Sequence, residues 1–145
     1  MIRRKALLLA TLALVGARST GAVLDVRVVS GTPQTSLAYA ASTEPGYVTT
    51  FAQPLVVRVA GMSATGGKVR YRCVSPHCRF AVSTQPDDVE RIDPQTYEVR
   101  LRRASASLRP TLGTDAPGTF AIDVRPVLHD GERAAGVARF TLTAR

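Results

Sequence analysis

Residues 120–125 read Phe-Ala-Ile-Asp-Val-Arg, so large apolar side chains alternate strictly with small or charged ones. A period of two puts every second side chain on the same face of an extended chain, which predicts a β-strand with one face in a core and the other in water. The same alternation extends through much of the chain, at 24–28, 68–73, 97–102 and 138–143, with shorter candidates at 55–59 and 80–82. Strands of this kind pair as antiparallel sheets, so the sequence predicts an all-β domain.

Turn dipeptides separate the alternating segments. Gly66-Gly67 and Asp130-Gly131 lie where hairpin turns are expected, and the Ala-Ser-Ala-Ser run at 104–107 is expected to be a surface loop. No segment after the first 22 residues shows helical spacing of apolar residues. Residues 23–145 are therefore expected to form one antiparallel β-sandwich of about 7–9 strands. The inward-facing positions expected to form its core are Leu24, Val26, Val57, Val69, Tyr71, Phe80, Tyr97, Val99, Leu101, Phe120, Ile122, Val124, Phe140 and Leu142.

The C-terminal part of the chain resembles bacterial immunoglobulin-like domains. Residues 117–124 contain the Gly-x-Phe-x-apolar pattern at Gly118 and Phe120 with which strand F of that family begins, and Asp115 stands just before it. Residues 137–143 are similar to the final strand G. The resemblance covers mainly residues 117–145, and it implies an immunoglobulin-like sandwich. The sequence departs from the family's pattern because Phe120 lacks the hydroxyl of a tyrosine corner and the chain has no Trp.

The first 22 residues have the pattern of a secretory signal peptide. The cationic Arg3-Arg4-Lys5 is followed by an apolar run at 6–15, which is long enough for a signal peptide and too short for an unaided bilayer crossing. Small residues allow cleavage after Ala17 or after Ala22. No other long apolar run follows, so no stable membrane span is expected after cleavage. We therefore expect a bacterial protein that is periplasmic or secreted.

Removal of this leader lowers the charge of the chain. The whole chain carries +8, but four of its nineteen basic residues and none of its eleven acidic ones lie in the leader, which leaves +4 after cleavage at Ala22. All but two of the basic residues are Arg, and the chain has no Asn, which is a composition typical of a GC-rich bacterial genome. Such a modest charge does not indicate a nucleic-acid partner.

Cys73 and Cys78 enclose the short segment Val-Ser-Pro-His. In an oxidising compartment, two cysteines at this spacing predict a disulfide that closes a small loop. Ser75, Pro76 and His77 would then form a rigid, exposed binding loop. The alternative is a copper or zinc site formed by Cys73, His77 and Cys78, which offers three ligands and requires free thiols.

Other chemistry-bearing patterns are sparse. The only histidines are His77 and His129, and the sequence has no motif of a hydrolase, metalloprotease or phosphate-binding loop, so no enzyme activity and no cofactor are expected. The acidic residues between 87 and 93 are interpreted as a solvated loop in preference to a calcium site, because their spacing lacks the Gly of a known calcium loop.

A possible cationic stripe is the last feature. Lys68, Arg70, Arg72, Arg100 and Arg102 would line one solvent-facing surface if their two strands are neighbours. Glu98 sits among them, which favours a solvated sheet face over a polyanion site.

The sequence thus predicts an exported, non-catalytic binding or structural module of the bacterial cell envelope. It would present loops or an edge strand to a protein or a cell-surface polymer. The alternative function is a small periplasmic metal-binding protein that uses the Cys73–Cys78 loop.

Overall fold

The computed structural model describes residues 22–41, 46–61 and 66–145. Its described residues form fourteen β-strands and no helix, which confirms the all-β prediction. Seven strands have five residues or more, and the other seven are shorter. The expected signal peptide lies outside the described residues except for Ala22. Among the described residues, no helix has the length and apolar content needed to cross a membrane.

The largest sheet has six strands. The alternating segments at 68–73, 97–102 and 120–125 lie side by side in it, and their apolar side chains all point to the same side of the sheet. Its strand order is β2 (Gln34–Thr35), β14 (Ala138–Ala144), β12 (Gly118–Pro126), β6 (Lys68–Cys73), β9 (Thr96–Arg100) and β8 (Val89–Asp93). All neighbours in this sheet are antiparallel except β2 and β14, which are parallel.

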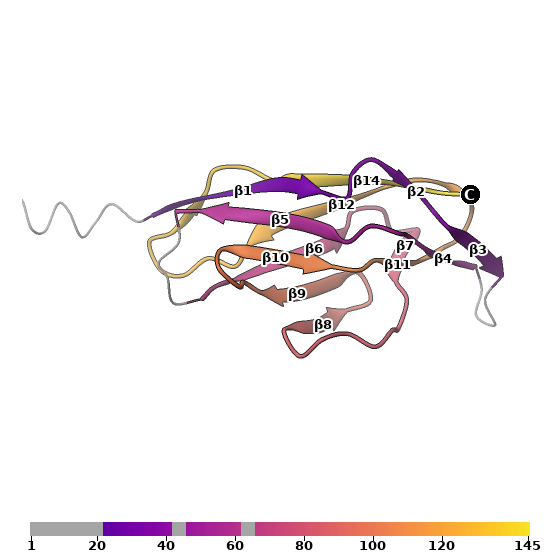
Figure 1. The fold of residues 1–145 in the computed structure, drawn as a ribbon, viewed down its shortest axis with the longest axis horizontal. Helices are drawn as coiled ribbons and strands as arrows, with labels where there is room; N and C mark the ends of the chain where they lie inside the picture. Colours follow the sequence, from indigo (N-terminus) through magenta and orange to yellow (C-terminus); the bar gives the residue numbers. More distant parts are fainter. Residues whose placement is uncertain (1–21, 42–45, 62–65) are drawn as a thin grey trace, which may run out of the picture.

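A second sheet has four strands and packs against the first through its apolar side chains. Its order is β10 (Ser105–Leu108), β5 (Leu55–Ala60), β1 (Val23–Ser30) and β13 (Arg133–Ala134). Figure 1 shows β1, β5 and β10 lying over the strands of the six-stranded sheet. The two layers form the predicted β-sandwich.

A third sheet extends one end of the sandwich. It consists of β3 (Ala38–Ala41), β4 (Tyr47–Thr50), β11 (Thr111–Thr114) and β7 (Cys78–Phe80), in that order. These strands directly precede or follow the longer strands of both layers in the chain. They gather at the right-hand end of the molecule in Figure 1.

The core lies between the two main sheets. Apart from Phe120, every predicted core position is buried, and Phe120 is only partly buried against the core cluster. The Tyr71 hydroxyl donates a 2.9 Å hydrogen bond to the Leu55 carbonyl of the opposite sheet, so one side chain of β6 reaches across both layers. Burial raises the pKa of this hydroxyl well above its usual range. The pattern missed the buried residues Phe51, Leu55, Val59, Ala106, Leu108 and Leu112.

Three connections differ from their prediction. Gly66-Gly67 is not a hairpin turn, because β5 and β6 belong to different sheets. The 104–107 run is not a loop, because Ser105–Leu108 forms β10, with Ala106 and Leu108 buried. The strand was missed because its small residues give a weak alternation. Asp130-Gly131 does lie in the connection between the antiparallel neighbours β12 and β14, but that connection is not a tight hairpin turn, because it includes β13 of the four-stranded sheet.

The tight turn before β10 explains how the chain changes sheets there. Arg103 and Ala104 both have positive φ, at 50° and 61°, and Arg102 and Ser105 exchange backbone hydrogen bonds of 2.8 and 3.0 Å. Positive φ at both central residues is the geometry of a type I′ turn, which residues other than Gly and Asn rarely adopt. The chain thus passes from the six-stranded to the four-stranded sheet within a few residues.

Candidate binding site: the stapled loop and the cationic sheet face

The disulfide predicted between Cys73 and Cys78 is present. β6 ends at Cys73 and β7 begins at Cys78, with their Cα atoms 5.8 Å apart and both residues 1% exposed. We call residues 73–78 the stapled loop. Because both sulfurs are joined in the disulfide, the alternative metal site lacks the two thiolates that it requires. The described residues also contain no cluster of three His, Cys, Asp or Glu side chains that could hold a metal ion.

Hydrogen bonds fix the backbone of the stapled loop. The Cys78 amide donates to the Ser75 carbonyl at 3.2 Å, and the His77 amide donates to the Ser75 hydroxyl at 3.1 Å. From the 93–96 turn, the Gln95 side-chain amide donates to the carbonyls of Ser75 and Cys78 at 2.8 and 3.1 Å. The side chains of Pro76 and His77 are exposed. The loop is therefore held by its backbone and faces solvent with its side chains.

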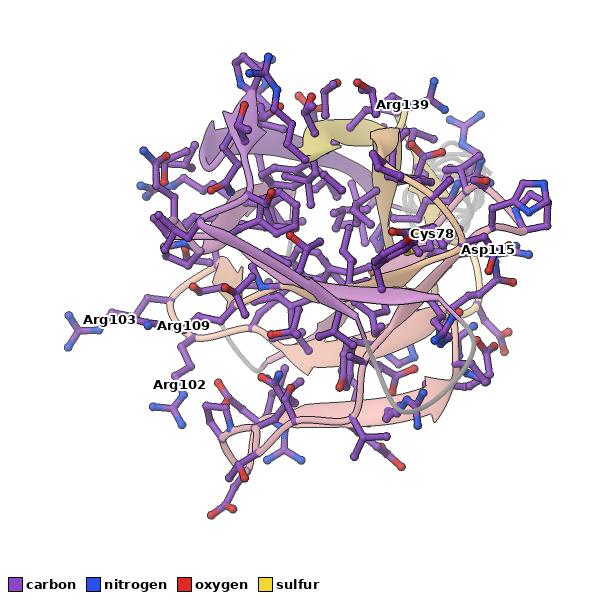
Figure 2. All side chains as sticks on the ribbon, turned by 90° about the vertical axis from the view of Figure 1, so that its right-hand side faces the viewer. Cys78, Arg102, Arg103, Arg109, Asp115 and Arg139 are labelled. Atoms are coloured by element: carbon purple, nitrogen blue, oxygen red, sulfur yellow. A yellow bond between two sulfur atoms is a disulfide. The ribbon has the colours of Figure 1, made fainter. Side chains whose placement is uncertain are left out.

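A carboxylate that the sequence analysis did not assign to this site completes it. His77 Nδ1 lies 2.8 Å from Asp115 Oδ2, and the Asp115 amide donates to the His77 carbonyl at 3.3 Å. Figure 2 shows Asp115 beside Cys78, on the opposite side of that view from Arg102, Arg103 and Arg109. Thirty-eight residues separate His77 from Asp115, so only the pairing of β7 with β11 brings them together.

Ser75, His77 and Asp115 do not form a catalytic triad. In a triad the serine hydroxyl contacts the ring nitrogen that the carboxylate leaves free. Here the Ser75 hydroxyl accepts a hydrogen bond from the His77 backbone instead. The side chains of His77 and Asp115 are also 70% and 57% exposed, so no enclosed site excludes water around them. The three side chains therefore lack the serine–histidine contact on which a triad depends.

The second histidine lies far from this loop. His129 follows the end of β12 at Pro126, which pairs with Val69 near the start of β6, whereas the stapled loop follows the end of β6. The His129 amide donates to Glu132 Oε1 at 2.6 Å within the β12–β14 connection. The two histidines are therefore at opposite ends of one strand and cannot act on one substrate atom.

The predicted cationic stripe exists because β6 and β9 are neighbours. Lys68 pairs in register with Arg100, and Arg70 with Glu98. Two of the three cations of β6 bind Glu98, Arg70 at 2.9 Å and Lys68 at 3.2 Å. The hydrogen bond from Arg70, helped by Lys68, lowers the pKa of the Glu98 carboxyl against the opposing effect of its burial. Arg102 instead lies beyond β9 and pairs with Asp88 at 3.2 Å.

Two further cations belong to the same sheet face and were not predicted. Arg125 lies on β12, directly opposite Arg70. Arg139 of β14 binds both oxygens of Asp123, at 2.6 and 3.0 Å, and this hydrogen bonding raises the pKa of the guanidinium. Figure 2 places Arg139 at the edge of the molecule. Only the order of the strands could reveal that β12 and β14 extend the charged face.

The acidic residues at 87–93 do not gather around one point. Glu90 and Asp93 lie on β8, which corrects the expectation of a loop there. Asp88 binds Arg102, and Asp93 Oδ1 accepts a 2.8 Å hydrogen bond from the Gln95 amide. Their positions along a strand and its preceding turn spread the carboxylates apart.

The fold and this surface define a class of protein: a disulfide-stapled β-sandwich with a charged outer sheet face. No protein-family model and no curated protein sequence matches the chain. Among solved structures, the chain is similar to the N-terminal domain of PorA, with 10% sequence identity, a TM-score of 0.41, and coverage of 84% of this chain and 97% of that one. The sequence identity and the TM-score are both too low for this likeness to indicate a function.

Proposed function

We propose that the chain is an exported, non-catalytic binding module of the bacterial cell envelope that contacts a partner through the stapled loop. The observation that carries this proposal is the state of the loop: its backbone is fixed by the disulfide and by hydrogen bonds, while Pro76 and His77 face solvent. A loop that is already ordered loses little entropy on binding, so its exposed side chains can contribute most of their contact energy.

The order of the strands supports an immunoglobulin-like fold. With residues 117–124 and 137–143 taken as strands F and G, the neighbours β14, β12 and β6 have the order G-F-C, and β10, β5 and β1 have the order E-B-A. These are the neighbours found in the two sheets of immunoglobulin domains. On such domains, the loops at the ends of the sandwich are the usual binding surface. The stapled loop occupies one of those ends.

The expected signal peptide at residues 1–22 supports the proposal that the chain is exported. The Arg133 amide donates a 3.0 Å hydrogen bond to the Ala22 carbonyl, and β1 begins at the next residue. Cleavage after Ala17 keeps this hydrogen bond, whereas cleavage after Ala22 removes it. We therefore expect a mature N-terminus at Arg18. The intact mass of protein from the periplasmic fraction of a bacterial host measures this directly, and full-length protein left in the cytoplasm contradicts export.

Site-specific photo-cross-linking tests the contact. A photoreactive amino acid replaces Pro76 in the stapled loop and, in a matched control, Asp130 in the β12–β14 connection at the other end of β6. After irradiation of cells, we expect a discrete covalent adduct from position 76 that position 130 does not give. Identical adducts from both positions, or none from position 76, contradict a contact through the loop.

A further inference from the structure

An open basin lies on the outer face of the six-stranded sheet, next to the stapled loop. It has a volume of about 700 Å³ and is formed by β6, β8, β9 and β12 together with Val74. This volume is in the range of ligand-binding clefts. The Val74 amide donates to the Ala121 carbonyl at 3.1 Å, so the adjoining disulfide and β12 together fix the wall that Val74 provides.

The basin holds two arginines whose charges are not matched. Arg125 stands directly opposite Arg70 on the neighbouring strand, and Arg72 stands opposite Asp123. However, Arg70 is bound to Glu98, and Asp123 is bound at both oxygens by Arg139. Within the described part of the chain, Arg72 and Arg125 form no ion pair. Arg125 therefore faces the like charge of Arg70 across two neighbouring strands, which destabilises the sheet. An anion bound beside Arg125 would reduce this repulsion.

Apolar side chains border the same basin. Ile92 is the extra residue of a β-bulge, because Arg91 pairs with Tyr97 and Asp93 pairs with Thr96, the residue just before Tyr97 in β9. A bulge re-aims the side chain that it carries. Ile92 is 45% exposed and Val74 is 49% exposed, and both line the basin. The site therefore combines guanidinium groups with aliphatic surface. The Asp93 carboxylate also lines the basin, and its Oδ1 accepts a 2.8 Å hydrogen bond from the Gln95 backbone amide.

This combination indicates the chemistry of the ligand. Guanidinium groups bind carboxylates through paired hydrogen bonds. The aliphatic side chains favour a ligand whose apolar groups bury them from water. No aromatic side chain is among the residues that line the basin, so it lacks the aromatic platforms on which nucleic acid bases usually stack. An acidic sugar has hydroxyl groups around its ring and only small C–H faces, so it would cover the aliphatic walls less well than aliphatic side chains. An extended peptide supplies both kinds of group along one strand.

We propose that this basin binds an acidic, partly apolar peptide segment of a partner protein, with Arg72 and Arg125 holding its carboxylates and Val74 and Ile92 contacting its apolar side chains. The inference rests on the proposed function, because it names the chemistry of the partner beside the stapled loop. Side chains two residues apart on an extended peptide are separated by about 6.6 Å. That spacing is close to the roughly 7–8 Å between diagonal positions on neighbouring strands, such as those of Arg72 and Arg125.

Fluorescence anisotropy with a labelled Glu-Val peptide tests this site. In this peptide, Glu and Val residues occupy every second position and Ser fills the positions between them, because side chains two residues apart lie on one face of an extended chain. The Glu-Ser peptide has Ser in place of each Val. The Arg72→Gln/Arg125→Gln variant is compared with the Arg58→Gln variant, which removes a charge from the exposed side of β5 in the other sheet. We expect the double variant to bind at least about tenfold more weakly than the wild type, because it loses charge-assisted hydrogen bonds, and the Arg58→Gln variant to bind within about twofold. Equal binding by the double variant and the wild type overturns the proposal.

The apolar wall has its own test. Ile92→Ser is expected to weaken binding of the Glu-Val peptide about threefold to tenfold, because buried aliphatic area is lost, and to leave binding of a Glu-Ser peptide unchanged. Equal weakening for both peptides overturns the role of the aliphatic wall. Binding of heparin or of anionic vesicles with no binding of either peptide overturns the peptide assignment in favour of a polyanion or a membrane surface.

The two proposals fail separately. A peptide that binds in this assay while position 76 gives no cross-link leaves the basin in place and removes the loop contact. A cross-link at position 76 with no peptide binding does the reverse.

Discussion

The same alternating segments form both faces of the six-stranded sheet. The burial of the inner side chains and the ion pairs of the outer side chains nevertheless depend on different features of the fold. On the inner face, Tyr71, Phe140 and their neighbours are buried regardless of which strand lies beside which, because any pairing that hides apolar side chains serves them. On the outer face, Arg70 finds Glu98, and Arg139 finds Asp123, only because of one strand order and one register. Burial of the inner side chains therefore drives folding. The order and register of the strands determine which charged side chains meet on the outer face.

The largest effect should come from emptying the inner face. Phe140 is fully buried and lies beside Tyr71, with 6.2 Å between the ring centroids. Phe140→Ala is expected to lower the free energy of unfolding by about 3–5 kcal/mol, through lost burial and the cavity left behind. Urea denaturation followed by circular dichroism measures it. Arg125→Ala on the outer face should change stability by less than about 0.5 kcal/mol. Equal losses in the two variants would contradict the contrast between the faces.

The disulfide joins the end of β6 to the start of β7, and both cysteines are buried at the base of the stapled loop. Replacing Cys73 and Cys78 together with Ala is expected to cost about 2 kcal/mol, which is the loop-closure entropy of a ring this small. Denaturation with and without reductant provides the internal control, because reductant should destabilise the wild type and leave the double variant unaffected. A variant as stable as the oxidised wild type would contradict this role.

On the inner face, the Tyr71 hydroxyl donates a hydrogen bond from one layer to the other, and it is the one such bond among the described residues. Tyr71→Phe leaves the buried Leu55 carbonyl without its donor, and we expect a loss of roughly 1 kcal/mol. Tyr97→Phe is the matched control, because the buried Tyr97 makes no such hydrogen bond within the described residues. Thermal unfolding of both variants distinguishes the effects. A loss from Tyr97→Phe as large as that from Tyr71→Phe would contradict the contribution of the hydrogen bond.

The smallest effect concerns Glu98 on the outer face. Because the fold lowers the pKa of this carboxyl, the ionised form stabilises the folded chain above the pKa of the unfolded chain, near 4.5. That contribution is lost as the pH falls through the lowered pKa. The stability difference between the wild type and Glu98→Gln should therefore be constant near neutral pH and shrink in acid. Urea titrations at several pH values measure it, and a difference that grows in acid would refute the assignment.

Local sequence pattern predicts the buried face of the sheet better than the exposed one. The strands, their buried faces and the disulfide followed from local pattern, and only Phe120 was placed too deep, because Gly118 and Phe120 lie near the end of their strand. The Gly66-Gly67 connection and β10 were misjudged. A glycine pair marks a turn without saying whether the chain stays in its sheet, and small residues leave little pattern to detect.

The site was harder to predict than the fold. Ser75, Pro76 and His77 were found because the two cysteines enclose them. Asp115 and Arg125 were not assigned to it, because their roles depend on neighbours brought from other parts of the chain. No residue near Asp115 in the sequence indicates that it will meet His77.

The parallel contact between β2 and β14 has a consequence for biosynthesis. Gln34 lies beside Leu142, and the Ser36 hydroxyl accepts a 3.1 Å hydrogen bond from the amide of Arg145. The two strands of this edge are more than a hundred residues apart in the sequence, so β2 can gain this neighbour only after β14 has been synthesised. Contacts of such high sequence separation have a large loop-closure cost and form slowly, so we expect this edge to pair late in folding.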